Sequence, residues 1–308
     1  MAQVHFSLSF LYLVHRIATI AFGTFTQLVR MKVFYFLAIF VVLAIALNFF
    51  RLPHTMGPEA VAAEELRLWK SGTIGLMKLF AIIFSLAATA LLIPRDLEDR
   101  ILYTILCKPV PRLDYLIGKL MGVLMLTFVA LLAMDLLMTA VLHHRTGIVE
   151  AERVAYLESI NYSKADIAIE VAEVRRHGPT LSLQFGILGI FLEAAVIAAV
   201  ALLISTFSSS TLFTIISTIL VYFIGFFMGQ AREYWLATTS MGESFIGKAA
   251  IQLLSLIFPD LSLFGLADAA IAGTFIPTFT ALKVCGLALA YLVTYTLVSW
   301  FVFADKEF

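Results

Sequence analysis

The sequence is poor in charged residues and in cysteine. Only 14% of its 308 residues are charged, and the two cysteines, Cys107 and Cys285, lie far apart. Soluble domains average about 25% charged residues, and disulfide frameworks or cysteine metal sites need several suitably spaced cysteines. The formal net charge is zero, which gives no support to a nucleic-acid partner. These shortages argue against a soluble domain, a disulfide scaffold and a nucleic-acid-binding protein.

The sequence also lacks the motifs of common ATP-dependent and hydrolytic enzymes. It contains no G-x-x-x-x-G-K-[ST] phosphate loop, no H-E-x-x-H helix and no G-x-S-x-G turn. The adjacent His143 and His144 have no acid or cysteine partner at ligand spacing, so we expect no metal site there. We therefore expect no catalytic residue and no cofactor in this chain. The energy for any transport would come from another chain or an ion gradient.

Apolar residues are in large excess, at 61% of the sequence, and the mean hydropathy is +0.98. A soluble globule of this size could not bury so much apolar surface, so lipid must be part of its solvent. A spanning helix needs about 20 mostly apolar residues. The apolar stretches do not show the alternation of barrel strands, so helices are expected. The pattern predicts one all-α integral membrane domain, 1–308. Its six transmembrane helices are expected at 33–50, 73–94, 116–142, 181–205, 212–229 and 281–303.

Three further segments are predicted to lie outside the spans. Residues 1–32 are predicted to form an elbow whose helix, at 15–32, lies in the membrane interface, or else simply extends the first span. Residues 143–180 are predicted to form a loop with one or two short helices, ended at Gly178-Pro179. The apolar run 249–258 is too short to span and predicts a re-entrant or interfacial helix before the last span. Residues 6–14 lack the basic start and cleavage site of a signal peptide, so we expect them to be retained.

The connection between the second and third spans carries the most informative pattern. Residues 96–119 read DLEDRILYTILCKPVPRLDYLIGK. The apolar residues recur at helical spacing, and the acids stand where the first turn of a helix at 95–108 is expected. Lys108-Pro109 should end that helix. The pattern predicts a short amphipathic helix that joins two spans and can transmit a displacement from a partner protein into the bilayer.

This string resembles the coupling helix of ABC-2-type ABC transporter permeases. The residues that carry the resemblance are Asp96, Glu98, Asp99, Arg100, Tyr103, Lys108, Pro109, Arg112, Gly118 and Lys119. Cys107 and Ile101 depart from the residues common at those positions. Weaker similarity covers most of the chain, including Asp260, Gly273, Tyr291 and the charged tail 303–308.

The resemblance implies an ATP-driven exporter in a bacterial or archaeal cytoplasmic (inner) membrane. Both termini and the coupling helix would be cytoplasmic, and residues 143–180 would form an extracytoplasmic loop between spans 1–3 (33–142) and spans 4–6 (181–308). The partners would be two copies of an ATP-binding subunit, which would hold ATP and Mg, and a second permease, identical or related. A second cytoplasmic contact would lie between spans four and five, at Ser208, Ser209 and Ser210. No substrate is implied.

Two carboxylates are predicted within spans, Asp135 in the third and Glu193 in the fourth. A charge at the bilayer centre is costly, so each should face protein or water. They could line a substrate or proton pathway, or simply make structural hydrogen bonds. Lys78 is expected near the outer end of the second span, where its amine can reach the interface. Two alternatives stay open: a gradient-driven transporter or channel that uses Glu193 and Asp135, and a non-transporting scaffold that uses the loop 148–176.

Overall fold

The computed structural model describes residues 2–47, 62–98, 110–208, 210–238 and 258–304. This part of the chain is helical and contains no β-strand, and five of its helices are long and apolar enough to cross a membrane. The expectation of an all-α membrane fold is confirmed to that extent. In chain order the elements are α1 (Ala2–Val29), α2 (Lys32–Leu47), α3 (Ala62–Glu98), α5 (Arg112–Ser159), α6 (Lys164–Arg176), α7 (Leu181–Phe207), α8 (Thr211–Thr238), the 3-10 helix η2 (Leu261–Phe264), α10 (Leu266–Ile271) and α11 (Thr278–Ala304).

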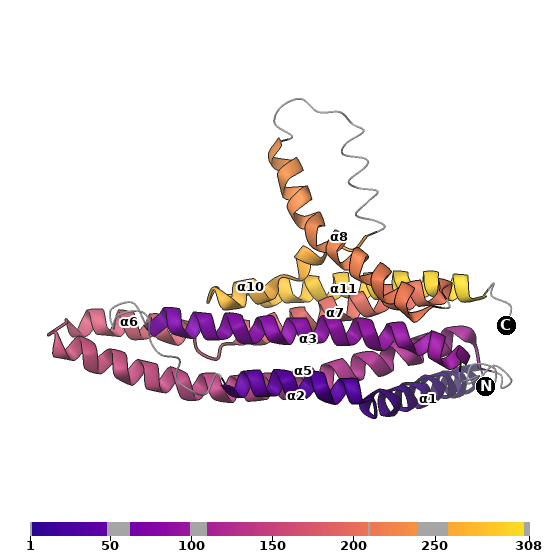
Figure 1. The fold of residues 1–308 in the computed structure, drawn as a ribbon, viewed down its shortest axis with the longest axis horizontal. Coiled ribbons are helices and arrows are strands. Elements are labelled where there is room, and N and C mark those ends of the chain that lie inside the picture. Colours follow the sequence, from indigo (N-terminus) through magenta and orange to yellow (C-terminus); the bar gives the residue numbers. More distant parts are fainter. Residues whose placement is uncertain (1, 48–61, 99–109, 209, 239–257, 305–308) are drawn as a thin grey trace.

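The helices form an elongated bundle in which α3, α5, α7 and α11 run alongside one another (Figure 1). The beginning of α1, the end of α3, the beginning of α5 and the end of α11 all lie at one end of this bundle. The second half of α8 stands away from the other helices. The connection between α3 and α5 therefore starts and ends at the same end of the bundle as the beginning of α1 and the end of α11.

α7 is the central helix of the bundle. It packs against α3, α5, α8, α10 and α11, and every residue from Ala194 to Leu202 is buried. This stretch reads AAVIAAVAL, which is apolar on all sides and rich in alanine. A helix that is apolar all round is suited to burial, and small side chains let neighbouring helices approach closely. The sequence of α7 therefore explains its central position.

Five of the six predicted spans correspond to the long apolar helices α3, α5, α7, α8 and α11. The first predicted span, 33–50, corresponds to α2, which has 16 described residues, and its last three positions lie outside the described residues. The predicted re-entrant run 249–258 lies outside them as well, except for Phe258. α3 does not end at Pro94, as predicted, but continues through this proline to Glu98.

α5 is longer than the predicted third span. It has 48 residues, which corresponds to about 72 Å at 1.5 Å per residue, against about 30 Å of hydrocarbon. Residues 143–159, predicted to belong to a loop, therefore continue this helix, and α6 folds back beside it. Asn161, with φ 56°, lies in the tight turn between them, and Arg153 Nη2 pairs with Glu170 Oε2 at 3.1 Å. The expected short helix and its end near Gly178 are confirmed in α6.

α1 is one long helix, separate from α2, that packs along α5. The chain breaks its helical course at Arg30 and Met31, so the alternative of a simple extension of the first span is wrong. Gly118 and Gly122 of α5 make the close approach possible, because a Cβ at Gly122 would lie 2.8 Å from the Ala21 carbonyl oxygen and one at Gly118 2.7 Å from the Ile20 side chain. Two small residues four positions apart are a recurrent device for such packing in membranes.

Candidate functional site at the connector between α3 and α5

The two flanks of the connector are joined by a buried ion pair. Asp96, in the last turns of α3, is 0% exposed. Its Oδ2 atom lies 2.6 Å from Lys119 Nζ and accepts a hydrogen bond of 2.6 Å from Tyr115 Oη, and both partners belong to α5. Separating the partners of such a buried pair would leave an uncompensated charge and is strongly destabilising. The end of α3 and the beginning of α5 are therefore fixed to each other.

The beginning of α5 is also fixed to the end of α11. Arg112 donates hydrogen bonds to the backbone carbonyl oxygens of Phe303, at 2.7 Å, and Ala304. The last carbonyl groups of a helix lack partners within the helix, and a cation at that end is favourable. The fully buried Phe303 ring stacks on Tyr115 with centroids 6.1 Å apart. One arginine thus joins two helices that are distant in sequence.

α1 completes the arrangement through its own ion pair. Arg16 Nη2 lies 3.0 Å from Asp114 Oδ2, whose side chain is only 5% exposed. The residues of these contacts join α1, α3, α5 and α11 around both flanks of the connector. We call them together the connector clamp: Arg16, Asp96, Arg112, Asp114, Tyr115, Lys119 and Phe303.

Part of the predicted coupling segment lies in this clamp. Asp96, Arg112 and Lys119 contact other helices of the same chain, and Gly118 packs against α1. Glu98 is the last residue of α3. The remaining predicted coupling residues lie outside the described residues: Asp99, Arg100, Tyr103, Lys108 and Pro109.

The predicted helical position of the acids was wrong where it can be compared. Asp96 and Glu98 belong to the last turn of α3 rather than to the first turn of a new helix, because α3 continues through Pro94. A helix C-terminus disfavours negative charge, so the dipole does not explain the acids there. For Asp96 the compensation comes from Lys119 and Tyr115, and sequence reasoning missed Tyr115, Asp114 and Arg16 because only tertiary packing brings them together.

The serines between α7 and α8 make local bonds. Ser208 Oγ donates to the Ser210 carbonyl oxygen at 3.1 Å and accepts from the Ser210 N–H at 3.0 Å. Ser210 Oγ accepts from Phe213 N–H at 3.5 Å, in the first turn of α8. Ser209 lies outside the described residues. The two described serines thus shape the turn, and a contact with a partner there stays a prediction.

Glu193 forms a second buried ion pair, away from the clamp. Its Oε2 atom lies 2.9 Å from Lys78 Nζ, and its side chain is 2% exposed. Lys78 was expected to reach the membrane interface, and this expectation is wrong because its amine turns to α7 instead. Glu193 Oε1 is buried and has no hydrogen-bond partner among the described residues. A lysine within one apolar helix and a glutamate within another were the available signal for this pairing.

Asp135 does not share a site with Glu193. Asp135 Oδ1 accepts hydrogen bonds from Thr139 Oγ1 at 3.1 Å and from Gln184 Nε2 at 3.2 Å. Gln184 and Glu193 are nine residues apart on α7, which places them about 13 Å apart along its axis. The structure therefore supports the hydrogen-bonding interpretation of Asp135 and keeps the two carboxylates apart.

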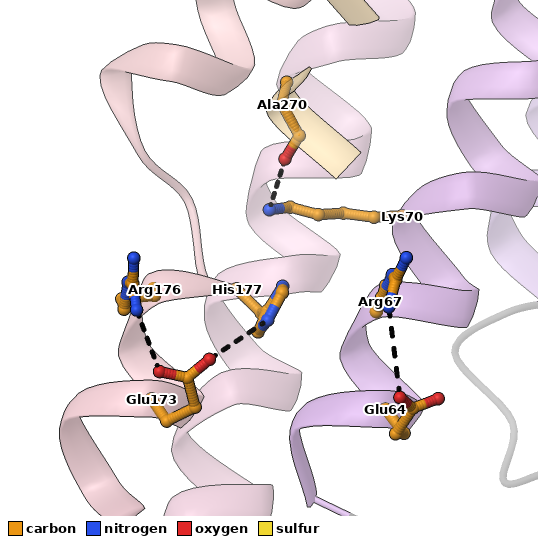
Figure 2. Close-up of polar contacts among 7 residues, drawn as sticks. All are labelled: Glu64, Arg67, Lys70, Glu173, Arg176, His177 and Ala270. Carbon is orange, nitrogen blue, oxygen red and sulfur yellow. Dashed lines mark hydrogen bonds and ion pairs between the residues drawn. The ribbon is translucent and has the colours of Figure 1, made fainter. Parts of the chain in front are cut away.

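A polar cluster lies at the far end of α3 (Figure 2). Lys70 is 1% exposed, and its Nζ atom donates to the Ala270 carbonyl oxygen, near the end of α10, at 3.1 Å. His177, between α6 and α7, lies 3.8 Å from Glu173 Oε1 through its Nε2 atom. Burial, and then the positive charge of Lys70, lower the pKa of His177 below its ordinary value of 6.5. The Lys70 contact fixes α10 to α3, whereas the contact between Glu173 and His177 is local to the end of α6.

The C-terminal residues of the resemblance have structural roles. Asp260 caps η2, since its Oδ1 atom accepts from Ser262 N–H at 3.1 Å, and its own N–H donates to Tyr291 Oη at 3.4 Å. Gly273 has a φ of +71° and lies against His177. A side chain at Gly225 of α8 would meet the Pro259 carbonyl oxygen at 2.5 Å. These residues seat the η2–α10 segment between α8, α7 and α11.

The long apolar helices indicate a multi-pass membrane protein. Within the described ranges, no group of three His, Cys, Asp or Glu side chains could hold a metal ion. No protein-family model matches the sequence, and no curated protein matches it.

Proposed function

We propose that this chain is the permease subunit of an ATP-driven ABC-2-type exporter. It would form the membrane pathway with a second permease and dock two ATP-binding subunits, which supply ATP and Mg, at the connector between α3 and α5. The observation that carries the proposal is the string 96–119, with its charged and apolar residues in the order typical of a coupling helix. The chain itself has no phosphate-loop motif.

The connector clamp supports this role on mechanical grounds. A coupling element works only if it is attached rigidly to the spanning helices, so that its displacement moves them as well. Both flanks are anchored: Asp96 to Lys119 on one side, and Arg112 to the end of α11 on the other. A displacement of the connector would therefore move α3, α5 and α11 together, and α1 through Arg16 and Asp114.

The test is purification of the tagged chain from its native membrane, followed by an ATPase assay on the eluate. The expected result is a co-purifying subunit with a phosphate-binding loop, in near-equal amount, that hydrolyses ATP. Glu98→Gln with Arg100→Gln should lower co-purification or ATPase activity. The matched control neutralises the exposed hairpin pair, Glu150→Gln with Arg175→Gln, and should change neither. Equal activity and equal co-purification in wild type and the connector variant would refute the proposed coupling role.

A gradient-driven transporter or channel is the second candidate, and the Lys78–Glu193 pair is the observation that favours it. Buried ionisable pairs within spans often lie on ion or proton pathways. Reconstituted protein with a pH-sensitive dye inside the vesicles tests this directly. Proton flux through the wild type, lost in Glu193→Gln without any ATP-binding subunit, would favour the gradient-driven function over the exporter.

A further inference from the structure

The loop between α10 and α11 exposes large apolar side chains. Phe275 is 81% exposed, and Phe279, in the first turn of α11, is 64% exposed. Leu181, at the beginning of α7, is exposed as well. It lies beside the loop, because Ser182 Oγ accepts a hydrogen bond of 3.1 Å from the Ile276 N–H. Exposed apolar residues gathered in this way mark a surface that contacts a membrane or another protein.

The level of this loop in the bundle follows from the contacts of α7 with α5. Gln184, two residues after Ser182, donates to Thr139 Oγ1 at 3.4 Å, so the loop lies near the level of Thr139. Arg112, at the connector, bonds the last carbonyl groups of α11. From Arg112 to Thr139, α5 rises about 40 Å, and a bilayer with its headgroups is about 40–45 Å thick. The loop therefore lies one bilayer thickness away from the connector.

α11 gives the same level independently. Its 27 residues correspond to about 40 Å, and its only charged residue is Lys283, near the end that joins the loop. The Lys283 amine lies 4.5 Å from the centroid of the Phe279 ring. A lysine near the end of an apolar helix reaches toward the headgroups, and phenylalanine suits the adjoining boundary with the acyl chains. Beyond this level, α5 continues into its hairpin with α6 (Figure 1).

We propose that the α10–α11 loop inserts Phe275 and Phe279 into the boundary between headgroups and acyl chains, on the membrane surface opposite the connector. The occupant of this surface is the lipid bilayer. Exposed threonines alternate with the two rings, as suits a layer in which polar and apolar groups meet: Thr274, Thr278 and Thr280. The inference does not depend on the proposed exporter function, because it requires only that the long apolar helices span a membrane.

Spin labelling of the full chain in vesicles of phosphatidylcholine and phosphatidylglycerol tests the insertion. Both cysteines are replaced by serine, and one nitroxide label is attached through Phe275→Cys or, in a second variant, through Phe279→Cys. Collisions with oxygen report hydrocarbon, whereas collisions with a water-soluble nickel chelate report water. At both positions, collisions with oxygen should exceed those with the chelate. The matched control is Ile169→Cys on α6, which is 68% exposed and lies in the hairpin, and there the order should be reversed.

Two results would overturn the proposal. A label at position 275 that meets the chelate as often as the label at position 169 would place the loop in water. A label there that meets neither reagent would show that a second copy of the chain or another protein covers the loop. Leu289→Cys, in the middle of α11 and 60% exposed, verifies the reconstitution, because its label should meet oxygen but not the chelate whenever the chain spans the bilayer.

Discussion

Removing one partner of the buried Asp96–Lys119 pair should destabilise the chain strongly. In Lys119→Met, the buried Asp96 side chain would lose its cation and keep only the Tyr115 hydroxyl as a donor among the described residues. Because Asp96 is fully buried and Lys119 is 5% exposed, solvent cannot replace the lost charge. Breaking a buried pair in this way costs about 3–5 kcal/mol. Lys164→Met, an exposed change of the same kind on α6, should cost less than about 0.5 kcal/mol.

The double variant Asp96→Asn with Lys119→Met measures the interaction between the two residues apart from the effect of each single change. The asparagine carries no charge and can still accept the Tyr115 hydrogen bond, so much of the loss should be recovered, with a coupling energy of about 2 kcal/mol. The assay is unfolding in mixed micelles with increasing denaturing detergent, followed by circular dichroism. A Lys119→Met variant as stable as the wild type, or strictly additive losses in the double variant, would show that this pair does not join α3 to α5.

Three further changes test the packing around the bundle. Gly122→Leu should separate α1 from α5 and lower stability by about 1–3 kcal/mol, whereas Gly147→Leu, with open space around it, should not; thermal unfolding compares them. Arg112→Gln should speed hydrogen exchange in the last turn of α11 alone, and unchanged exchange would contradict its bonds to that helix. Because burial lowers the pKa of His177, the unfolded chain binds the proton more tightly, so stability should fall as pH drops through 6.5; His177→Gln should remove that fall.

The spanning helices could be predicted from the sequence because the bilayer imposes their length and composition. A backbone in hydrocarbon must satisfy its own hydrogen bonds, so each apolar stretch of sufficient length becomes a helix. Helix ends were less predictable. α3 continues through Pro94 and α5 through residues 143–159, because packing against neighbouring helices outweighs the local signals for a break.

The candidate site could be predicted only in part, because its contacts join residues far apart in sequence. The string 96–119 drew attention to Asp96 and Lys119, but its pattern did not show that they pair with each other. Arg16 lies within the predicted interfacial helix 15–32, and nothing in the sequence indicated that it pairs with Asp114. Lys78 had the features of a residue that reaches the membrane surface, and only the position of α7 shows that Glu193 is its partner.

The polar contacts of α3 connect the clamp with the interior of the membrane domain. Asp96 and Lys78 are eighteen residues apart, which is five turns and about 27 Å, so both lie on the same face of this helix. Lys70, about 12 Å beyond Lys78, holds α10 at the far end. A rigid helix with ionic contacts at its end and near its middle cannot shift at one contact without straining the other. In the proposed exporter, movement of the connector would therefore act on the Lys78–Glu193 pair. Glu193→Gln should then alter the ATPase activity of the co-purified complex, although the connector itself is unchanged.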